Sequence, residues 1–176
     1  MGLLDAIREN MERGAPLEEL VKDLCWKDFE GFAADIFSEN GFIVYRNVRF
    51  ATGSGRRRYE IDVAAFQRPR VVLVDCKHWG VRAGKSSGIR GAAVKQGIRA
   101  HQFEGKLPEV FPEATAWERA LVIPVIVTLH QEEVIEHNGV FVAPIFKLNQ
   151  FIEELRCGIF DGREIKVTSL RQFLGV

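Results

Sequence analysis

The stretch YEIDVAAFQRPRVVLVDCKHWG, residues 59–80, decides the fold, because it predicts two adjacent strands joined by a short turn. Residues 59–66 and 71–79 are rich in β-branched and other apolar residues, and QRPR between them has the length of a turn. Side chains alternate across a strand, so Asp75 and Lys77 project from one face at the end of the second strand. This acid–base pair is either a structural ion pair or half of an active site.

The rest of the chain predicts one mixed α/β sheet flanked by helices. Residues 27–39 follow the i, i+3, i+4, i+7 apolar pattern of a helix, and Asn40-Gly41 provides a signal for its end. Pro124 interrupts an apolar strand, which favours a sheet edge at that point. The further elements expected are helices at 3–13, 17–24, 89–106 and 148–155, and strands at 42–51, 120–129 and 140–146.

The predicted order is α-β-β-β-α-β-β-α plus a C-terminal hairpin at Asp161-Gly162. We divide the chain into an N-terminal helical extension (1–26), a core domain (27–157) and a C-terminal hairpin or tail (158–176). At 176 residues the chain has the length of one domain.

Charge is distributed unevenly along the chain, although 24 basic and 24 acidic residues leave no net charge. The segment from Arg46 to Arg99 contains 13 Lys and Arg residues but only three acids, which are Glu60, Asp62 and Asp75. Such asymmetry is typical of a polyanion-binding surface; the alternative is a solvated basic face balanced by acidic helices elsewhere. The position of all three acids in or beside the opening motif favours the first interpretation.

Cysteine usage and the apolar pattern predict a cytoplasmic protein without membrane segments. Cys25, Cys76 and Cys157 are widely spaced and form no zinc pattern with the histidines, so reduced thiols are expected. No apolar run approaches the roughly 20 residues that span a bilayer, and the N-terminus lacks the pattern of a signal peptide.

A metal site is predicted where the two strands of the opening stretch meet. The hairpin-scale turn makes these strands neighbours, so Asp62 is expected close to Asp75 and Lys77. Two carboxylates held together need a cation or a proton, and Mg²⁺ prefers a few carboxylate oxygens plus waters. Lys77 would then orient a water or neutralise a phosphate; a rim salt bridge is the alternative for Asp75 and Lys77.

Asp62, a 12-residue gap and Asp75-Cys76-Lys77 resemble the signature of the PD-(D/E)XK nuclease superfamily. The helix DFEGFAADIFSENGFIV, with Glu30 and the pair Gly41-Phe42, is similar to that of Mrr-like restriction endonucleases and archaeal Holliday junction resolvases. Ile61 stands where the superfamily motif has proline, and Asp75 stands where Glu is more frequent.

The resemblance implies a restriction-endonuclease-like fold and roles for the matching residues. Asp62, Asp75 and the main-chain carbonyl of Cys76 would bind Mg²⁺, for which Mn²⁺ would substitute. Lys77 would be the catalytic lysine, and Glu30 an accessory ligand; for Glu30 an ordinary exposed acid on an amphipathic helix is the alternative.

Other polar residues near the motif are candidates for contacts to nucleic acid. Residues 80–86 look like a P-loop, but Trp79 occupies the position of its first glycine, so an NTPase is not expected. The tryptophans Trp26 and Trp79 are expected to pack in the core, and His78 is expected in packing or at an interface and not as a base. The predicted nucleic-acid-binding residues are Arg56, Arg57, Arg58, Lys85, Ser86, Lys95 and Gln96, with Gln102 and Glu60 left open as additional site residues.

The sequence therefore predicts a Mg²⁺-dependent endodeoxyribonuclease that hydrolyses phosphodiester bonds of DNA. The resemblance further implies a homodimer, and the absence of a separate recognition domain favours structure-selective or weakly specific cutting, or a targeting partner protein. The rival interpretation is a catalytically inactive nuclease-fold module that binds DNA or another protein.

Overall fold

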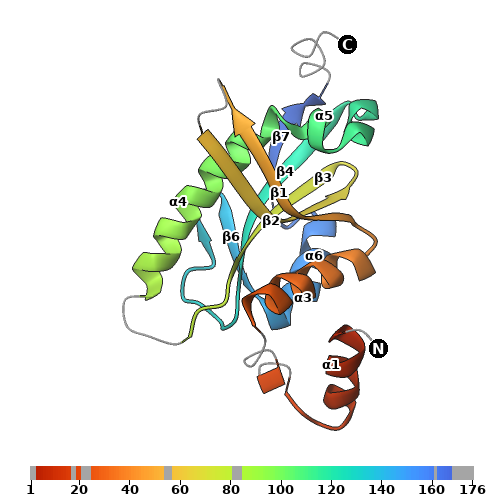
Figure 1. Cartoon of the computed structure of the whole chain (residues 1–176), viewed down its shortest axis with the longest axis vertical. Helices are drawn as coiled ribbons and strands as arrows, with labels where there is room; N and C mark the ends of the chain where they lie inside the picture. The colour runs from red at the N-terminus through yellow and green to blue at the C-terminus, as the bar shows by residue number, and fades with distance from the viewer. Residues whose placement is uncertain are drawn as a thin grey trace.

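A seven-stranded sheet lies at the centre of the molecule, with helices on both of its faces (Figure 1). The computed structural model describes residues 3–16, 19–20, 25–53, 57–80, 85–160 and 162–167. The strands are β1 (Ile43–Thr52), β2 (Arg57–Gln67), β3 (Arg70–Lys77), β4 (Arg119–Thr128), β5 (Glu136–His137), β6 (Val140–Pro144) and β7 (Arg163–Lys166). The helices are α1 (Leu3–Glu12), α3 (Trp26–Glu39), α4 (Lys85–Glu104), α5 (Leu107–Val110), α6 (Leu148–Arg156) and the 3₁₀ turns η1 (Pro112–Ala116) and η2 (Ile145–Lys147).

The strand order confirms the predicted mixed sheet. Strands follow one another as β1-β2-β3-β4-β6-β5, with β7 beside β4. β1, β2 and β3 are antiparallel neighbours, whereas β3, β4 and β6 run parallel. A parallel connection from β3 to β4 needs a long crossover, and α4 supplies most of it.

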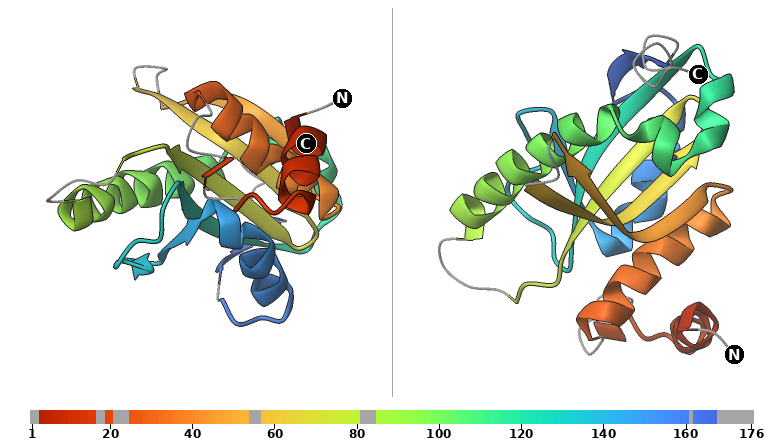
Figure 2. Two further views of the ribbon diagram at one scale, coloured as in Figure 1. Left: turned by 90° about the horizontal axis from the view of Figure 1, so that it is seen from below. Right: turned by 45° about the horizontal axis from the view of Figure 1, so that its top comes forward.

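Two helical layers enclose the sheet (Figure 2). One face packs against α3 and α6, whose buried residues share a core cluster with inward-facing residues of β2, β3 and β4. The opposite face packs against α4 and α5. β3 therefore lies between helices on both sides, which explains its nearly continuous apolar sequence.

The apolar face of α3 fixes this helix on the sheet. Phe29, Ala33 and Phe37 recur at four-residue spacing and are fully buried. The predicted end signal is confirmed, because Gly41 has φ +76° and the N–H of Phe42 donates to the carbonyl of Phe37. This cap directs the chain straight into β1.

The edge predicted at Pro124 exists only locally. β4 pairs with β3 from Leu121 to Thr128. On the other side of β4, the pairing with β7 ends at Val122 and the pairing with β6 begins at Val125. Pro124 lies in this gap, where its missing N–H costs no pairing with β6 or β7.

The C-terminal segment predicted to form a hairpin instead pairs with a remote strand. Residues 163–166 form β7, but β7 pairs antiparallel with β4 and not with the residues that precede Gly162. Gly162 is required at the approach to β4, because a Cβ there would lie 2.6 Å from the Cγ1 of Ile123. Most of the helix predicted at 17–24, and Asp161 of the hairpin turn, lie outside the described residues.

Candidate active site

The strands β2 and β3 separate at the two predicted carboxylates. Their regular pairing runs from Gln67 and Arg70 to Val63 and Val74, and in the same register the next pair would be Asp62 and Asp75. In place of a ladder bond, Asp62 Oδ2 accepts a hydrogen bond of 2.7 Å from the main-chain N–H of Cys76. The structure thus brings Asp62 beside the Asp75-Cys76-Lys77 segment.

The β1 backbone is also irregular opposite Asp62. Arg46 pairs with Val63 and Val48 pairs with Ile61, but Asn47 between them has φ +51°. A left-handed residue inside a strand interrupts the ladder, and asparagine tolerates this conformation better than most residues. The pairing of Asp62 is therefore interrupted on both sides, which leaves its side chain free to turn toward β3.

Asp75 is held by two cations. Its carboxylate is nearly buried, with 4% of the residue exposed. Lys77 Nζ lies 2.6 Å from Asp75 Oδ2, and Arg99 Nη1 from α4 lies 2.7 Å from Asp75 Oδ1. The predicted Asp75–Lys77 pair is present, and Arg99 is an additional site residue that the sequence interpretation missed.

Gln96 holds Arg99 in position from the interior. Its side chain is fully buried, its Nε2 donates to the Leu73 carbonyl at 2.8 Å, and its Oε1 accepts from Arg99 Nη1 at 3.2 Å. The prediction that Gln96 contacts nucleic acid does not fit this placement, because a fully buried amide cannot reach a ligand in solvent. Gln96 connects β3 to the site through Arg99.

Glu30 approaches the same carboxylates from α3. It is buried, with 7% exposed, and its Oε1 accepts a hydrogen bond from the indole N–H of Trp26. This burial disfavours the alternative of an ordinary exposed acid.

Burial and neighbouring charges both act on the Asp62 carboxylate. Burial raises the pKa of Asp62 to about 6, opposed by the hydrogen bond from the Cys76 N–H. The negative charges of Asp75 and Glu30 raise this pKa further, and Lys77 lowers it. Ionisation of Asp62 therefore costs free energy in this fold, mainly because of burial.

The chemistry of these donors suits a hard divalent cation with few protein ligands. In the described part of the chain, no three His, Cys, Asp or Glu side chains are grouped closely enough to bind one ion. Two carboxylates and a main-chain carbonyl remain, and Mg²⁺ is commonly bound by one or two carboxylates while it keeps several waters. Asp62, Asp75 and the Cys76 carbonyl are the residues that fit it; the role of Glu30 as a ligand stays a prediction.

Two tryptophan rings lie close to the ammonium group of Lys77. Lys77 Nζ lies 5.6 Å from the ring centroid of Trp26 and 5.9 Å from that of Trp79. Trp26 is 43% exposed, so the expectation that it lies in the core is wrong, whereas His78 packs edge-on against Phe29 as expected.

A cleft opens between the end of β3 and α4. Its volume is about 340 Å³. It is lined by Asp75, Lys77, Trp79, Gly88, Gly91, Ala92, Lys95 and Arg99. The predicted nucleic-acid-binding residue Lys95 therefore lies next to the catalytic candidates, in a cleft with three cationic side chains.

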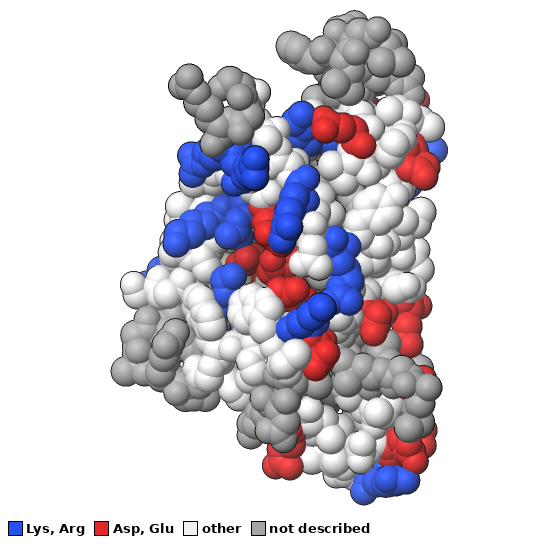
Figure 3. Space-filling view, viewed as in Figure 1, with Lys and Arg blue, Asp and Glu red and all other residues white. Residues whose placement is uncertain are grey.

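Acidic side chains lie at the middle of this face, and Lys and Arg encircle them (Figure 3). Arg57 and Arg58 are exposed at the start of β2. Glu60 pairs with Arg49 at 3.3 Å on the surface. Ser86 Oγ donates to Glu133 at 3.0 Å; Arg56 and the side chain of Lys85 lie outside the described residues.

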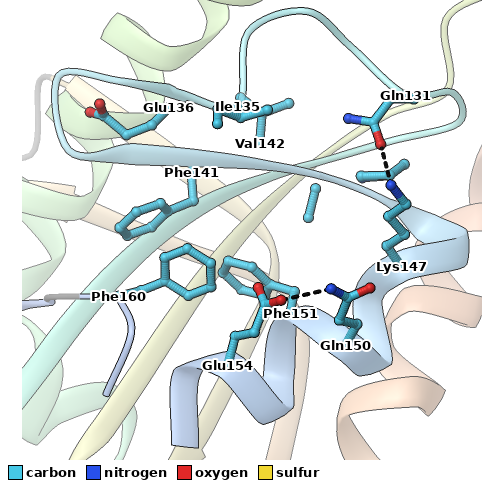
Figure 4. Close-up of a pocket in the computed structure, with 12 residues that line it drawn as sticks. Gln131, Ile135, Glu136, Phe141, Val142, Lys147, Gln150, Phe151, Glu154 and Phe160 are labelled. Carbon is cyan, nitrogen blue, oxygen red and sulfur yellow. Dashed lines mark hydrogen bonds between the residues drawn. The ribbon is translucent and has the colours of Figure 1, made fainter. Parts of the chain in front are cut away.

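A second cavity, of about 270 Å³, lies between β6 and α6 (Figure 4). Phe160 contacts Phe141 and Phe151 there, with ring centroids 4.8 and 4.9 Å apart. Its lining contains none of the predicted catalytic residues, so this cavity is separate from the carboxylate site.

Residues 21–105 match the family model described as restriction endonuclease, a segment that contains every candidate catalytic residue. This match confirms the predicted resemblance to the PD-(D/E)XK, Mrr-like nuclease superfamily over that segment.

Individual relatives add no established activity. An uncharacterized protein of Archaeoglobus fulgidus is 29% identical over 130 residues, which cover 74% of this chain and 91% of that one. The solved structure of protein VC1899 from Vibrio cholerae aligns with 84% of this chain at 18% identity and a TM-score of 0.36, and this chain spans only 34% of its length. That of AF1548, a protein of unknown function, aligns with 76% of this chain and 79% of its own at 14% identity and a TM-score of 0.40.

Proposed function

We propose that this protein is a metal-dependent DNA endonuclease that hydrolyses phosphodiester bonds. The observation that carries the proposal is the opening between β2 and β3, where the Asp62 carboxylate is tied to the Cys76 N–H beside Asp75 and Lys77. Two carboxylates from neighbouring strands can bind a divalent cation, and one lysine beside them can stabilise the negative charge of a phosphodiester under attack.

Asp62, Asp75 and the Cys76 carbonyl would bind Mg²⁺, with Mn²⁺ as a substitute and Glu30 as an accessory ligand. When bound, the cation would polarise the scissile phosphate and lower the pKa of a coordinated water. Burial is the main cause of the raised pKa of Asp62, and the charges of Asp75 and Glu30 add to it; this supports the assignment, because a bound cation would offset both effects.

Lys77 would stabilise the negative charge that grows on the phosphate oxygens during attack, or orient the attacking water. Its contact with Asp75 and the rings of Trp26 and Trp79 restrict the ammonium group to the site. A lysine held in this way contributes through preorganisation, since it need not be ordered when the substrate arrives.

DNA is the substrate that fits the charge distribution. Basic residues of β1, β2 and α4 surround the carboxylates, and such a surface binds the phosphate backbone (Figure 3). We further propose a cytoplasmic homodimer, since duplex DNA presents two strands related by a two-fold axis, and a partner protein that supplies targeting. No helix in the described part of the chain is long and apolar enough to cross a membrane.

One observation favours the second candidate, an inactive nuclease-fold module that binds DNA or another protein. Both oxygens of Asp75 are already paired with cations, Lys77 and Arg99. In a module without metal, these two side chains would take over the charge compensation permanently.

Cleavage assays separate the two functions. Supercoiled, linear, branched, flap and methylated DNA would be incubated with the protein in Mg²⁺, Mn²⁺ or EDTA. We expect cleavage that requires the metal and disappears in Asp75→Ala. Lys147→Ala, in the lining of the separate second cavity, is the matched control. Binding without cleavage on every substrate would instead establish the inactive module.

A further inference from the structure

Both Lys77 and Arg99 compensate the negative charge of Asp75. One carboxylate needs one cation for neutrality, yet Lys77 and Arg99 each contact a separate oxygen of Asp75. A divalent cation that approaches either oxygen of Asp75 therefore meets a positive charge already placed there, and it competes with these contacts. Lys77 follows Asp75 on the same strand, whereas Arg99 reaches it from α4.

The local structure keeps Arg99 in place without Asp75. The buried Gln96 accepts from Arg99 Nη1 and is itself bonded to the Leu73 carbonyl. Both contacts of the guanidinium use Nη1, and within the described part of the chain Nη2 and Nε make no hydrogen bond. Arginine has five donors in a planar fork, so these atoms are free to bind an anion bidentately.

The adjoining cleft provides room for that anion. Lys95 lies one helical turn before Arg99 and lines the same cleft, with Lys77 on the opposite wall. Two glycines leave the α4 wall open: a Cβ at Gly91 would meet nothing within 4 Å, and one at Gly88 would contact Trp79 at 3.4 Å. A concave site with three cationic side chains fits a phosphate group.

We propose that Arg99 exchanges partners during substrate binding. In the metal-free protein it neutralises Asp75, and when a divalent cation binds Asp75 it joins Lys95 to bind a phosphate of the DNA strand in this cleft. The inference rests on the proposed nuclease function, and it assigns the cleft to a backbone phosphate next to the one that is cleaved.

The exchange couples metal and DNA. Arg99 competes with the cation for Asp75, so metal affinity without DNA is lower than the carboxylates alone would give. A phosphate that binds Arg99 removes this competition, and each ligand then strengthens the binding of the other.

Two binding measurements test the exchange. Mn²⁺ would be titrated calorimetrically into the wild type, Arg99→Gln and Lys95→Gln without DNA. The affinity for uncut duplex would then be measured with Ca²⁺ over a range of salt concentrations. Lys95→Gln is the control for charge, because it removes one positive charge from the same cleft without touching Asp75.

We expect Arg99→Gln to bind Mn²⁺ about 5- to 10-fold more tightly, and Lys95→Gln to bind it as the wild type does. Both variants should bind DNA more weakly, with a salt slope reduced by about one. Unchanged or weaker Mn²⁺ binding by Arg99→Gln would overturn the exchange. Unchanged DNA affinity and salt slope in the exposed variant Lys95→Gln would overturn the phosphate site, even if Arg99→Gln failed to fold.

The outcome is separable from that of the proposed function. Tighter Mn²⁺ binding by Arg99→Gln together with no cleavage of any DNA would refute the nuclease and leave the exchange intact. Cleavage by the wild type with unchanged Mn²⁺ affinity in Arg99→Gln would support the nuclease and refute the exchange.

Discussion

Asp62 Oδ2 on β2 accepts a hydrogen bond from the main-chain N–H of Cys76 on β3, at a distance of 2.7 Å. This bond takes the place of regular pairing, which ends one residue earlier at Val63 and Val74. It holds the Asp62 carboxylate in a site where burial raises the pKa of Asp62 to about 6, and the negative charges of Asp75 and Glu30 contribute to the rise. Ionised Asp62 therefore lowers the stability of the fold, and the proposed cation would offset this cost.

Replacement of Asp62 by Asn should stabilise the metal-free protein at neutral pH. The pKa of Asp62 is about 6 in the fold and 3.8 for the free group, so the folded state binds more protons between these values. The ionised carboxylate thus lowers stability progressively from pH 4 to pH 6, and fully above pH 6. We expect Asp62→Asn to raise the free energy of unfolding by about 1–3 kcal/mol at pH 7.5.

Urea unfolding at pH 7.5 and pH 3.5, in EDTA, measures this effect. The asparagine oxygen still accepts from the Cys76 N–H, so the substitution removes charge and little else. The gain in the free energy of unfolding should be nearly absent at pH 3.5, because Asp62 is then mostly protonated in both the folded and the unfolded state. An equal gain at both pH values would contradict the electrostatic explanation.

Lys77→Ala should abolish cleavage while DNA binding persists. The lysine contributes one positive charge at the reacting phosphate, and removal of one such preorganised group typically lowers kcat by about 10²–10³-fold. Single-turnover cleavage and gel-shift affinity measure the two effects on the same protein. A loss of DNA affinity as large as the loss of rate would make Lys77 a binding residue.

Gln96→Leu should destabilise the protein and disturb Arg99. The substitution leaves the Leu73 carbonyl without its side-chain donor and removes the Arg99 contact, for which we expect about 1–3 kcal/mol in urea unfolding. Gln102→Leu, in the same helix at a partly exposed position, is the matched control and should change stability by less than about 0.5 kcal/mol. Equal effects of the two substitutions would refute the positioning role.

Affinity for DNA should fall steeply with salt. Bound phosphates release condensed counterions, so the logarithm of the binding constant falls linearly with the logarithm of the salt concentration. Removal of the exposed Arg57 and Arg58 should reduce that slope by about one for each phosphate that the protein no longer binds. A slope near zero in the wild type would exclude the basic face as the DNA-binding surface.

Much of the sheet and the carboxylate site could be predicted from local patterns. Strand periodicity and the short QRPR turn fix which residues of β2 and β3 are opposite one another, and this placed Asp62 beside Asp75. The helical pattern and the Asn40-Gly41 end signal likewise fixed α3, and with it Glu30.

Arg99 could not be predicted in the same way, because its contact with Asp75 joins a helix to a strand 24 positions apart. A signal existed in α4, where Gln96 occurs within the buried stripe of Ile89, Ala93, Ala100 and Phe103. A polar residue at such a position indicates an internal hydrogen-bond network. The pairing of β7 with β4 could not be predicted for a similar reason. Asp161-Gly162 is a local turn signal, whereas the partner strand is distant in the sequence.

The binding of Mn²⁺ to the wild type, Asp62→Asn and Asp75→Asn, measured by calorimetry, tests the proposed metal site most directly. Glu60→Gln is the matched control, because Glu60 lies two residues from Asp62 but pairs with Arg49 on the surface. We expect Mn²⁺ to bind the wild type and Glu60→Gln equally, and each aspartate substitution to weaken binding at least about tenfold. Mn²⁺ binding that survives both aspartate substitutions, or no binding by the wild type in the presence or absence of DNA, would contradict the proposed site.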